Sequence, residues 1–219
     1  MQTWQRLLKR VFLLVSNQPI TTIIDLLRHG DVEGGSKYRG QLDDPLSELG
    51  WEQLRTTTSK KQNWQHVISS PLKRCVEFAY ELSQTHTLPL HNEDEFKEIS
   101  FGLWEGKNSE ELLNFEPDEI KKYWADPVNV TPPQGENLLD FEKRVINGWE
   151  NILNEFQGKH ILLISHAGVM RIILCHILNM PLTELFKLDI GLAKASRIQV
   201  EHIDGEYWSR LIFHGSEFT

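Results

Sequence analysis

The chain has 219 residues, a formal net charge of −8, 40% hydrophobic residues and 25% charged residues. A chain of this length can bury the core of one domain, and the composition is ordinary for a soluble globular protein. The acidic balance argues against a nucleic-acid partner, because nucleic-acid recognition needs a basic patch. The sequence holds no run of 18 apolar residues, so we expect no membrane span.

Apolar residues at helical spacing predict an amphipathic helical extension over residues 1–18. We expect this extension to pack on the body of the protein or on a neighbouring subunit, and the second case would give a homodimer. A membrane-surface helix, a disordered extension and a start-site artefact are the alternatives. The apolar residues of the predicted face are Trp4, Leu7, Leu8, Val11, Phe12 and Val15.

The two cysteines, Cys75 and Cys175, fall on apolar faces of predicted helices. Buried, reduced thiols of this kind are typical of a cytoplasmic protein, which is the location we expect. Seven of the nine histidines lie outside the motifs described below, and their spacing does not match that of metal ligands.

From residue 19 to residue 219 the pattern predicts a single domain in which strands and helices alternate. Ser70 is the predicted N-cap of its helix with Pro71 at the first helical position, and Gly158 is the predicted C′ residue of a later helix. This alternation predicts an α/β fold, a three-layer sandwich with a mostly parallel central sheet flanked by helices. The predicted elements are a strand at 20–27, a helix at 47–62, a strand at 66–69, a helix at 71–84, a short strand at 88–90, a helical insertion at 103–136, a helix at 138–157, a strand at 160–165 followed by a helix, and strands at 196–202 and 207–213 joined by a turn at 204–205.

Three predicted strand ends carry side chains suited to phosphate chemistry. The first strand ends in Arg28 and His29, and a later strand is followed by His166 at the start of a helix. Arg74 lies one turn into the helix that follows another strand. Because ligands bind outside the carboxyl ends of strands in open α/β sheets, we expect two histidines and two arginines at one edge.

Four motifs, taken in order, resemble the histidine phosphatase superfamily, which has the phosphoglycerate-mutase-like fold. The resemblance covers about residues 20–213, and within the family it is closest to the α-ribazole phosphatases through segments 38–51 and 123–136. The four motifs are Arg28-His29-Gly30, Ser69 to Arg74, Glu98 to Gly106, and Ser165 to Gly168.

The resemblance implies a metal-independent phosphomonoesterase that works through a phosphohistidine. His29 would be the nucleophile and Glu98 the acid, while Arg28, Arg74 and His166 would bind the phosphoryl group, with His29 beside them. The implied reaction removes the 5′-phosphate of α-ribazole 5′-phosphate or of adenosylcobalamin 5′-phosphate, in cobalamin biosynthesis. The partner is then a small phosphorylated substrate. Neither a cofactor nor a metal is expected, since two arginines and a histidinium can supply the positive charge.

Other functions stay open. The chain could be a broad-specificity phosphatase of sugar or nucleotide monoesters, a phosphoglycerate-mutase-like enzyme, or an inactive protein that binds a phosphorylated ligand. Val32 and Gly35 favour the last case, because many family members carry threonine and asparagine at these positions.

Three further residues are candidates for contacts to substrate: Arg39 and Gly40 on the first loop, and Gly168 after the second histidine. Glu105 is the alternative to Glu98 as the acid. The insertion at 103–136 should set the substrate, since loops over strand ends vary specificity on a fixed scaffold. Its aromatic residues either line a pocket for a flat base or form the insertion's own core; they are Trp104, Phe115, Tyr123 and Trp124.

Overall fold

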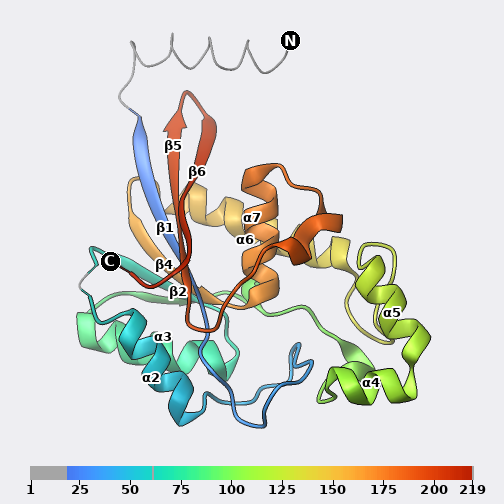
Figure 1. Cartoon of the computed structure of the whole chain (residues 1–219). Helices are drawn as coiled ribbons and strands as arrows, with labels where there is room; N and C mark the ends of the chain where they lie inside the picture. The colour runs from blue at the N-terminus through green and yellow to red at the C-terminus, as the bar shows by residue number, and fades with distance from the viewer. Residues whose placement is uncertain (1–18, 61, 219) are drawn as a thin grey trace, which may run out of the picture.

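The computed structural model describes residues 19–60 and 62–218, so the helix predicted over residues 1–18 lies outside the described residues. A six-stranded sheet forms the centre of the molecule, in the order β3-β2-β4-β1-β5-β6 (Figure 1). Its strands are β1 (Ile20–Arg28), β2 (His66–Ser69), β3 (Leu90–Asn92), β4 (His160–Ser165), β5 (Ala195–Ile203) and β6 (Glu206–Ser216).

The sheet is mixed, with a parallel part and an antiparallel part. Strands β1 to β4 pair in parallel, as the alternation of strands and helices predicts. Strand β5 runs antiparallel to β1, and β6 runs antiparallel to β5. The two last strands are joined by Asp204 and Gly205, which have φ values of 51° and 82°. Positive φ at both central residues is typical of a type I′ hairpin turn, which agrees with the predicted turn.

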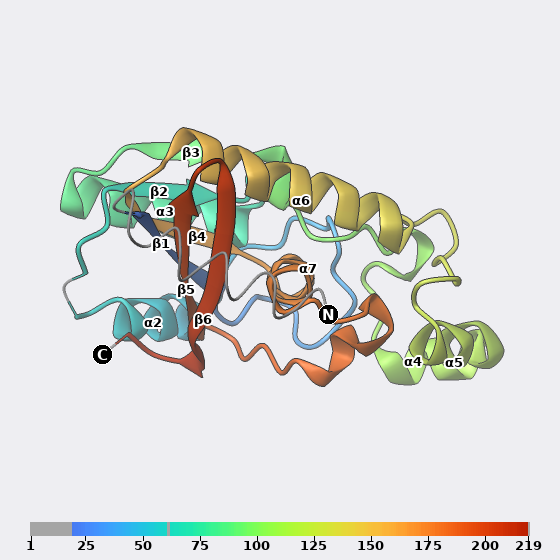
Figure 2. The same ribbon diagram turned by 90° about the horizontal axis from the view of Figure 1, so that it is seen from above.

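Helices cover both faces of the sheet, which confirms the three-layer sandwich (Figure 2). Alternate residues of a strand point to opposite faces. Accordingly, Ile24 and Leu26 of β1 pack in the core under helices α6 (Leu138–Glu155) and α7 (Ala167–Leu178). Leu27 packs in the second core, under α2 (Glu48–Thr57) and α3 (Lys73–His86).

Helices α4 (Ser109–Phe115) and α5 (Pro117–Ala125) stand apart from the sheet (Figure 1). They close over a small core of their own, made by Trp104, Leu112, Ile120 and Tyr123. Short 3₁₀ turns complete the chain: η1 (Asp94–Phe96), η2 (Gly102–Trp104) and η3 (Leu182–Lys187). In the described part of the chain, no helix has the length and apolar character that crossing a bilayer would need.

Helix α2 ends at Thr57, five residues before the predicted end at 62. A run of threonines follows Arg55, and β-branched side chains are poor helix formers. Their hydroxyls also donate hydrogen bonds to backbone carbonyls: Thr57 donates to Ala193 O at 2.8 Å, and Thr58 donates to Leu54 O at 2.8 Å.

The predicted start of α3 is wrong: its N-cap residue is Leu72 rather than Ser70. The Ser70 hydroxyl lies 2.7 Å from His166 Nε2 across the sheet edge, and its bond from the Leu72 amide is long, at 3.4 Å. Asp43 supplies a substitute, because its carboxylate accepts from the Lys73 amide at 2.7 Å in the first turn of α3.

The end of α6 also differs from the prediction. Its C-cap residue is Phe156, so Gly158 lies one position beyond C′. Gly158 still supplies the left-handed backbone, with φ of 74°, and its amide donates to Thr22 Oγ1 at 3.0 Å.

Candidate active site

The carboxyl ends of β1, β2 and β4 meet at one edge of the sheet. In the strand register, Arg28 of β1 lies opposite Ser165 of β4, and Ser69 of β2 lies opposite Ile164. The residues that follow each strand, His29, Ser70 and His166, are therefore placed side by side. The rings of His29 and His166 lie 5.3 Å apart.

His29 is buried and has one nitrogen fixed by the backbone. Its Nδ1 lies 2.8 Å from the carbonyl oxygen of Gly30, and a carbonyl can only accept, so Nδ1 carries the hydrogen. Burial lowers the pKa of His29 well below its usual value, and the charges of Arg74 and Arg28 lower it further. The ring is thus neutral at pH 7, with its lone pair on Nε2.

Arg74 reaches the site from the first turn of α3 and is buried. Its Nη1 donates to Leu42 O at 2.8 Å and its Nη2 donates to Gly40 O at 2.7 Å, so the first loop fixes the guanidinium plane. Its Nε lies 3.2 Å from His166 Nδ1 and donates to it. All of these acceptors are neutral, so the positive charge of Arg74 is available to an anion.

Both ring nitrogens of His166 have partners in the protein. Nδ1 accepts from Arg74, which leaves the hydrogen on Nε2, and Nε2 donates to the Ser70 hydroxyl at 2.7 Å. Burial lowers the pKa of His166 well below its usual value, and Arg74 and His29 act in the same direction. In this arrangement His166 orients Arg74 and Ser70. To donate to a phosphoryl oxygen as well, its ring would have to exchange one of these partners.

Arg28 is the second arginine at the edge. Its Nη1 donates to Ile190 O at 2.5 Å, whereas its Nε is buried without a hydrogen-bond partner among the described residues. Burial lowers the pKa of Arg28, while Glu98 raises it. An unpaired buried donor is costly, and a bound anion would satisfy it.

Glu98 lies beside the start of α7. Its carboxylate accepts from the amide of Gly168 at 3.1 Å and from the amide of Ile99 at 3.1 Å. The contact is close because residue 168 lacks a side chain: a Cβ there would lie 2.2 Å from Glu98 Oε1.

The carboxylate of Glu105, the alternative acid, joins two segments of the backbone. One of its oxygens accepts from the amides of Gln41 and Phe101, both at 3.0 Å, and from the Ser100 hydroxyl at 3.1 Å. These bonds tie the first loop to the insertion and occupy the carboxylate.

Arg39 turns into its own loop. Its Nη2 donates to the carbonyls of Glu33 at 2.7 Å and Gly35 at 2.5 Å, and its Nε lies 3.2 Å from Asp44 Oδ2. Gly40 contributes a carbonyl to Arg74 rather than a side chain, and its φ of 51° suits glycine. In this structure both residues therefore shape the phosphate site through the loop.

The two departures from the family pattern also belong to this loop. Val32 is buried and forms an isolated β-bridge with Leu46. Gly34 and Gly35 have φ values of 81° and 72°, a left-handed backbone that suits glycine.

The aromatic residues of the insertion divide between the two interpretations. Trp104 and Tyr123 are buried in the insertion's own core. Phe115 is 77% exposed. Trp124 lies at the surface, where its indole donates to the Tyr38 hydroxyl at 2.8 Å. The core interpretation thus holds for Trp104 and Tyr123, and Trp124 is linked to that core through Tyr38, which packs against it.

Together Arg28 and Arg74 give the site a positive charge beside the neutral ring of His29. Such a site fits a phosphoryl group, whose transition state spreads negative charge over its equatorial oxygens. Among residues 19–60 and 62–218, no three histidine, cysteine, aspartate or glutamate side chains are placed to hold a metal ion.

Two polar residues of the site were missed from the sequence alone. The local pattern predicts Ser70 as a helix cap and assigns no role to Arg171, on α7. Arg171 could have been found from its spacing, because it lies three residues after Gly168 and so shares the helix face that meets Glu98.

Comparison with known proteins identifies the family to which the chain belongs. Residues 24–211 match the family model described as the histidine phosphatase superfamily, branch 1. A bifunctional protein of Mycobacterium tuberculosis is 30% identical over 192 residues, which are 85% of this chain and 52% of that protein. The chain therefore spans about half the length of the first such relatives.

Two further relatives are matched over most of their length. The phosphoserine phosphatase 1 of Hydrogenobacter thermophilus is 28% identical over 180 residues, covering 80% of this chain and 85% of the relative. The adenosylcobalamin/alpha-ribazole phosphatase of Salmonella typhimurium is 28% identical over 173 residues, covering 76% and 85%. The solved structure of a mycobacterial glucosyl-3-phosphoglycerate phosphatase has a TM-score of 0.81 at 22% identity, covering 90% of this chain and 100% of that chain, and so shares the fold.

Proposed function

Because the chain belongs to the histidine phosphatase superfamily, we propose that it is a phosphomonoesterase that works through a phosphohistidine on His29. The motif resemblance to this family is confirmed by the match over residues 24–211. One observation carries the proposal: the bond from Nδ1 of His29 to the Gly30 carbonyl leaves Nε2 unprotonated beside two arginines. A neutral imidazole held this way is a ready nucleophile.

The reaction proceeds in two displacements. In the first, Nε2 of His29 forms a bond to phosphorus while the bond from phosphorus to the ester oxygen breaks, and Glu98 protonates the departing alkoxide. In the second, Glu98 takes a proton from water, the water oxygen bonds to phosphorus, and the nitrogen–phosphorus bond breaks. The products are an alcohol and inorganic phosphate, and the histidine is restored.

Arg28 and Arg74 stabilise the charge on the phosphoryl oxygens in both steps. Their guanidinium groups are held by carbonyls, so they need little reorganisation when the charge develops. His166 acts through Arg74 and Ser70, and it gains a proton or exchanges a partner when the dianion enters. These groups supply the positive charge that a metal would otherwise provide, so the proposed reaction needs no metal.

The finer question is the substrate. The α-ribazole 5′-phosphate and adenosylcobalamin 5′-phosphate candidates are supported by the motif resemblance and by the relative of that name. The relative named phosphoserine phosphatase is equally similar and supports a second candidate, a small aliphatic monoester with a carboxylate.

Two measurements test the proposal. The purified protein is assayed in a chelator for phosphate release from α-ribazole 5′-phosphate and from p-nitrophenyl phosphate. A parallel sample is quenched in alkali during turnover and its phosphopeptides are mapped by mass spectrometry. We expect phosphate release in the chelator and a phosphoryl group on His29. A preference of about 10³-fold for α-ribazole 5′-phosphate, about 4 kcal/mol in transition-state binding, would support the cobalamin role. Binding without turnover and without a phosphohistidine would indicate a phospho-ligand binding protein instead.

A further inference from the structure

Arg144 of α6 binds the backbone that carries Glu98. Its Nη1 donates to the carbonyls of Glu95 and Lys97, both at 2.8 Å, and its Nη2 donates to the carbonyl of Glu98 at 3.1 Å. Three carbonyl groups within four residues therefore converge on one guanidinium group. Arg144 takes no part in the proposed reaction, but it holds the segment from which the proposed acid extends.

The remaining donors of this guanidinium group bind Glu136. Nε of Arg144 donates to Glu136 Oε1 at 2.7 Å and Nη2 donates to Oε2 at 2.8 Å, which makes a bidentate ion pair. A guanidinium group has five N–H donors, and these contacts engage all five. Arg144 differs in this from Arg28, whose Nε has no hydrogen-bond partner among the described residues. The guanidinium of Arg144 is thus fixed in its plane by the protein, and its donors are used within the fold.

Glu136 holds the same segment a second time, two residues beyond the acid. Its Oε2 accepts from the amide of Ser100 at 3.2 Å, and its own amide donates to the Ser100 carbonyl at 2.8 Å. The guanidinium carbon of Arg144 lies 4.7 Å from the centre of the Phe141 ring, so one face of the ion pair is covered by an aromatic side chain. The backbone on both sides of Glu98 is therefore tied to this pair.

The backbone of α6 also lies close to this segment, one turn beyond Arg144. Gly148 is buried, and a Cβ there would lie 2.8 Å from Glu95 Cβ and 2.9 Å from Phe96 Cζ. Residues four apart share one face of a helix, so Gly148 and Arg144 both face η1 and the residues after it. The helix thus packs directly on the backbone that its arginine binds, and the two cannot shift independently.

The carboxylate of Glu98 is held by other elements than its backbone. The amide of Gly168, at the start of α7, donates to one oxygen at 3.1 Å, and the amide of Ile99 donates to the other at 3.1 Å. The main chain of Glu98 is held by Arg144 from α6. A general acid must lie within hydrogen-bond reach of the leaving oxygen, and a side chain that is fixed at both ends keeps that place.

We propose that Arg144 is a positioning residue for the general acid. Through the backbone of residues 95–98 it sets where the Glu98 carboxylate lies relative to the leaving oxygen, and Glu136 assists because it orients the guanidinium. This inference rests on the proposed function, in which Glu98 protonates the departing alkoxide. It adds to that function an ion pair of the chain that acts on one step of the reaction without touching the substrate.

The test uses two substrates whose leaving groups differ in their need for an acid. p-Nitrophenolate is a stable anion that departs without a proton, whereas the alkoxide released from benzyl phosphate is a strong base that must be protonated as it leaves. kcat/KM is measured on both for the wild type, Arg144→Lys and Glu136→Gln, with Glu98→Gln as the reference. Arg55→Gln is the matched control, because it removes another bidentate Arg–Glu pair, at an exposed site between α2 and α3.

The ratio of the two kcat/KM values is the decisive quantity, because it does not depend on how much of a variant is folded. Glu98→Gln should lower kcat/KM on benzyl phosphate by about 10²- to 10⁴-fold, the range of general acid catalysis, and affect p-nitrophenyl phosphate much less. Arg144→Lys keeps the charge but loses the planar fork. It should lose about 10- to 100-fold on benzyl phosphate and less than about threefold on p-nitrophenyl phosphate. Glu136→Gln should show the same pattern more weakly, and Arg55→Gln should leave the ratio unchanged.

An unchanged ratio in Arg144→Lys would overturn the inference, whether both values fall together or neither falls, because a purely structural support acts on both substrates alike. An equal change of the ratio in Arg55→Gln would overturn it too, since the effect would then not be particular to this pair. If Glu98→Gln leaves the ratio unchanged, Arg144 has no acid to position and the inference is wrong.

Failure of the proposed function would look different. The wild type would then release no phosphate from either substrate, and no phosphohistidine would form. The inference would fall with it, because the chain would have no leaving group to protonate. A wild type that hydrolyses both substrates through a phosphohistidine, combined with an unchanged ratio in Arg144→Lys, would leave the proposed function standing and remove the positioning role alone.

Discussion

Strand β1 carries two buried polar clusters, three residues apart, that differ in how their charges are matched. Asp25 is fully buried, and its carboxylate accepts from Arg197 at 2.7 and 2.9 Å, from Trp64 at 2.7 Å and from His160 at 2.8 Å. Arg28 has a carbonyl as its hydrogen-bond acceptor and an unpaired Nε. A charge that the protein neutralises fully has a structural role, whereas one left partly unmatched is poised for a ligand.

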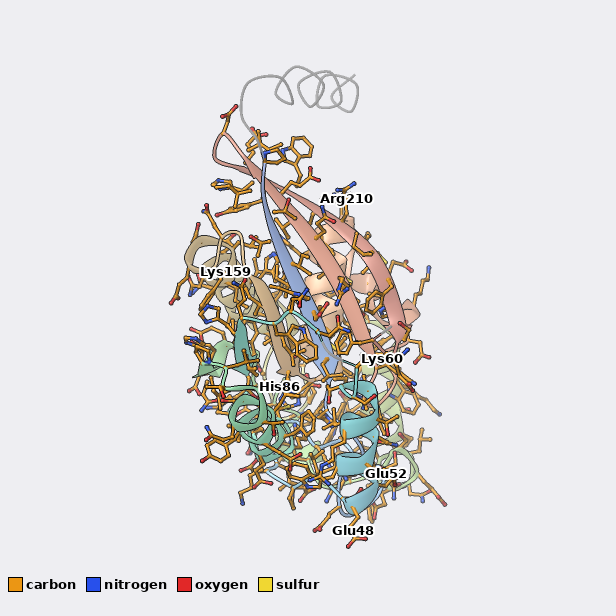
Figure 3. The ribbon with its side chains drawn as sticks, turned by 90° about the vertical axis from the view of Figure 1, so that its left-hand side faces the viewer. Glu48, Glu52, Lys60, His86, Lys159 and Arg210 are labelled. Atoms are coloured by element: carbon orange, nitrogen blue, oxygen red, sulfur yellow. The ribbon has the colours of Figure 1, made fainter. Side chains whose placement is uncertain are left out.

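The two clusters also differ in what borders them. Trp64 and His160 line a cavity of about 740 Å³ whose wall includes His86 and Lys159, on the face shown in Figure 3. This cavity is large, yet it lies away from the three strand ends that gather the histidines and arginines. The candidate site is therefore assigned from the gathered histidines and arginines and the partly unmatched charge of Arg28, and not from the volume of this cavity.

His29→Ala should have the largest effect of the variants considered, because it changes activity without changing the fold. The change removes the proposed nucleophile and, of the hydrogen bonds described, the one to Gly30, so activity should fall by about 10⁴-fold or more with the fold intact. The measurements are kcat on p-nitrophenyl phosphate and the thermal midpoint, with His86→Ala, at an exposed position of α3 (Figure 3), as the control. Near-normal turnover in His29→Ala would remove His29 as the nucleophile.

Asp25→Asn should show the opposite pattern, with stability lost and activity kept. The change leaves Arg197 without its counter-ion and weakens the bond to His160, which we expect to lower the free energy of unfolding by about 3 kcal/mol. For a domain of this size that is a drop in Tm of about 6–12 °C. Asp94→Asn, at a 77% exposed carboxylate, serves as the matched control. An unchanged Tm would mean that the cluster is not structural.

The pH dependence of stability should separate the two clusters. His29 and His166 have pKa values lowered by burial, so below about pH 6.5 the unfolded chain binds protons that the folded chain does not. The free energy of unfolding should therefore fall as the pH drops from 7.5 to 5.5, by up to about 1.4 kcal/mol per pH unit for each histidine.

Urea unfolding at three pH values measures this slope. His166→Gln should flatten it and His86→Gln should leave it unchanged. Asp25 acts in another window: burial raises its pKa, but Arg197 and His160 outweigh that and the pKa is lowered, so its contribution is present above about pH 4 and is lost below. A wild-type slope that His166→Gln does not alter would contradict the neutral state of that ring.

The smallest effect is expected for Val32→Thr, which restores the side chain that many family members carry. Val32 is buried in the β-bridge with Leu46, so the new hydroxyl enters the core and should cost about 1 kcal/mol of stability. kcat/KM should change by less than about threefold. A large gain in rate would show that residue 32 reaches the phosphoryl group, and that the valine weakens this site.

The sequence was sufficient to predict each strand and the groups that follow β1, β2 and β4, because apolar runs and the residues after them are local signals. The short strand predicted at 88–90 is displaced, and lies at Leu90–Asn92. His29, Arg74 and His166 could be placed at one edge, since parallel strands end together. Contacts between distant segments could not be read this way. The bond between Ser70 and His166 joins residues 96 positions apart, and it competes with the helix cap that the local pattern predicts.

The contacts of Asp25 are a second example of pairings that the local sequence could not predict. It stands in an apolar strand, and its partners come from segments that are 39 to 172 residues away in sequence. Arg39 looked like a ligand contact because it sits beside Gly40, but the loop's own carbonyls compete for its donors. Local chemistry identifies which groups can bind a phosphate, and only the folded backbone decides which of them are already engaged.

The contact between Gly168 and Glu98 has a consequence for how this protein can vary. No side chain fits at residue 168 while the carboxylate of residue 98 stays in place, because even a methyl group would overlap it. The two positions are 70 residues apart. Any side chain at residue 168 would force the flexible end of Glu98 to move, so the place of this carboxylate depends on a glycine in a distant segment of the chain.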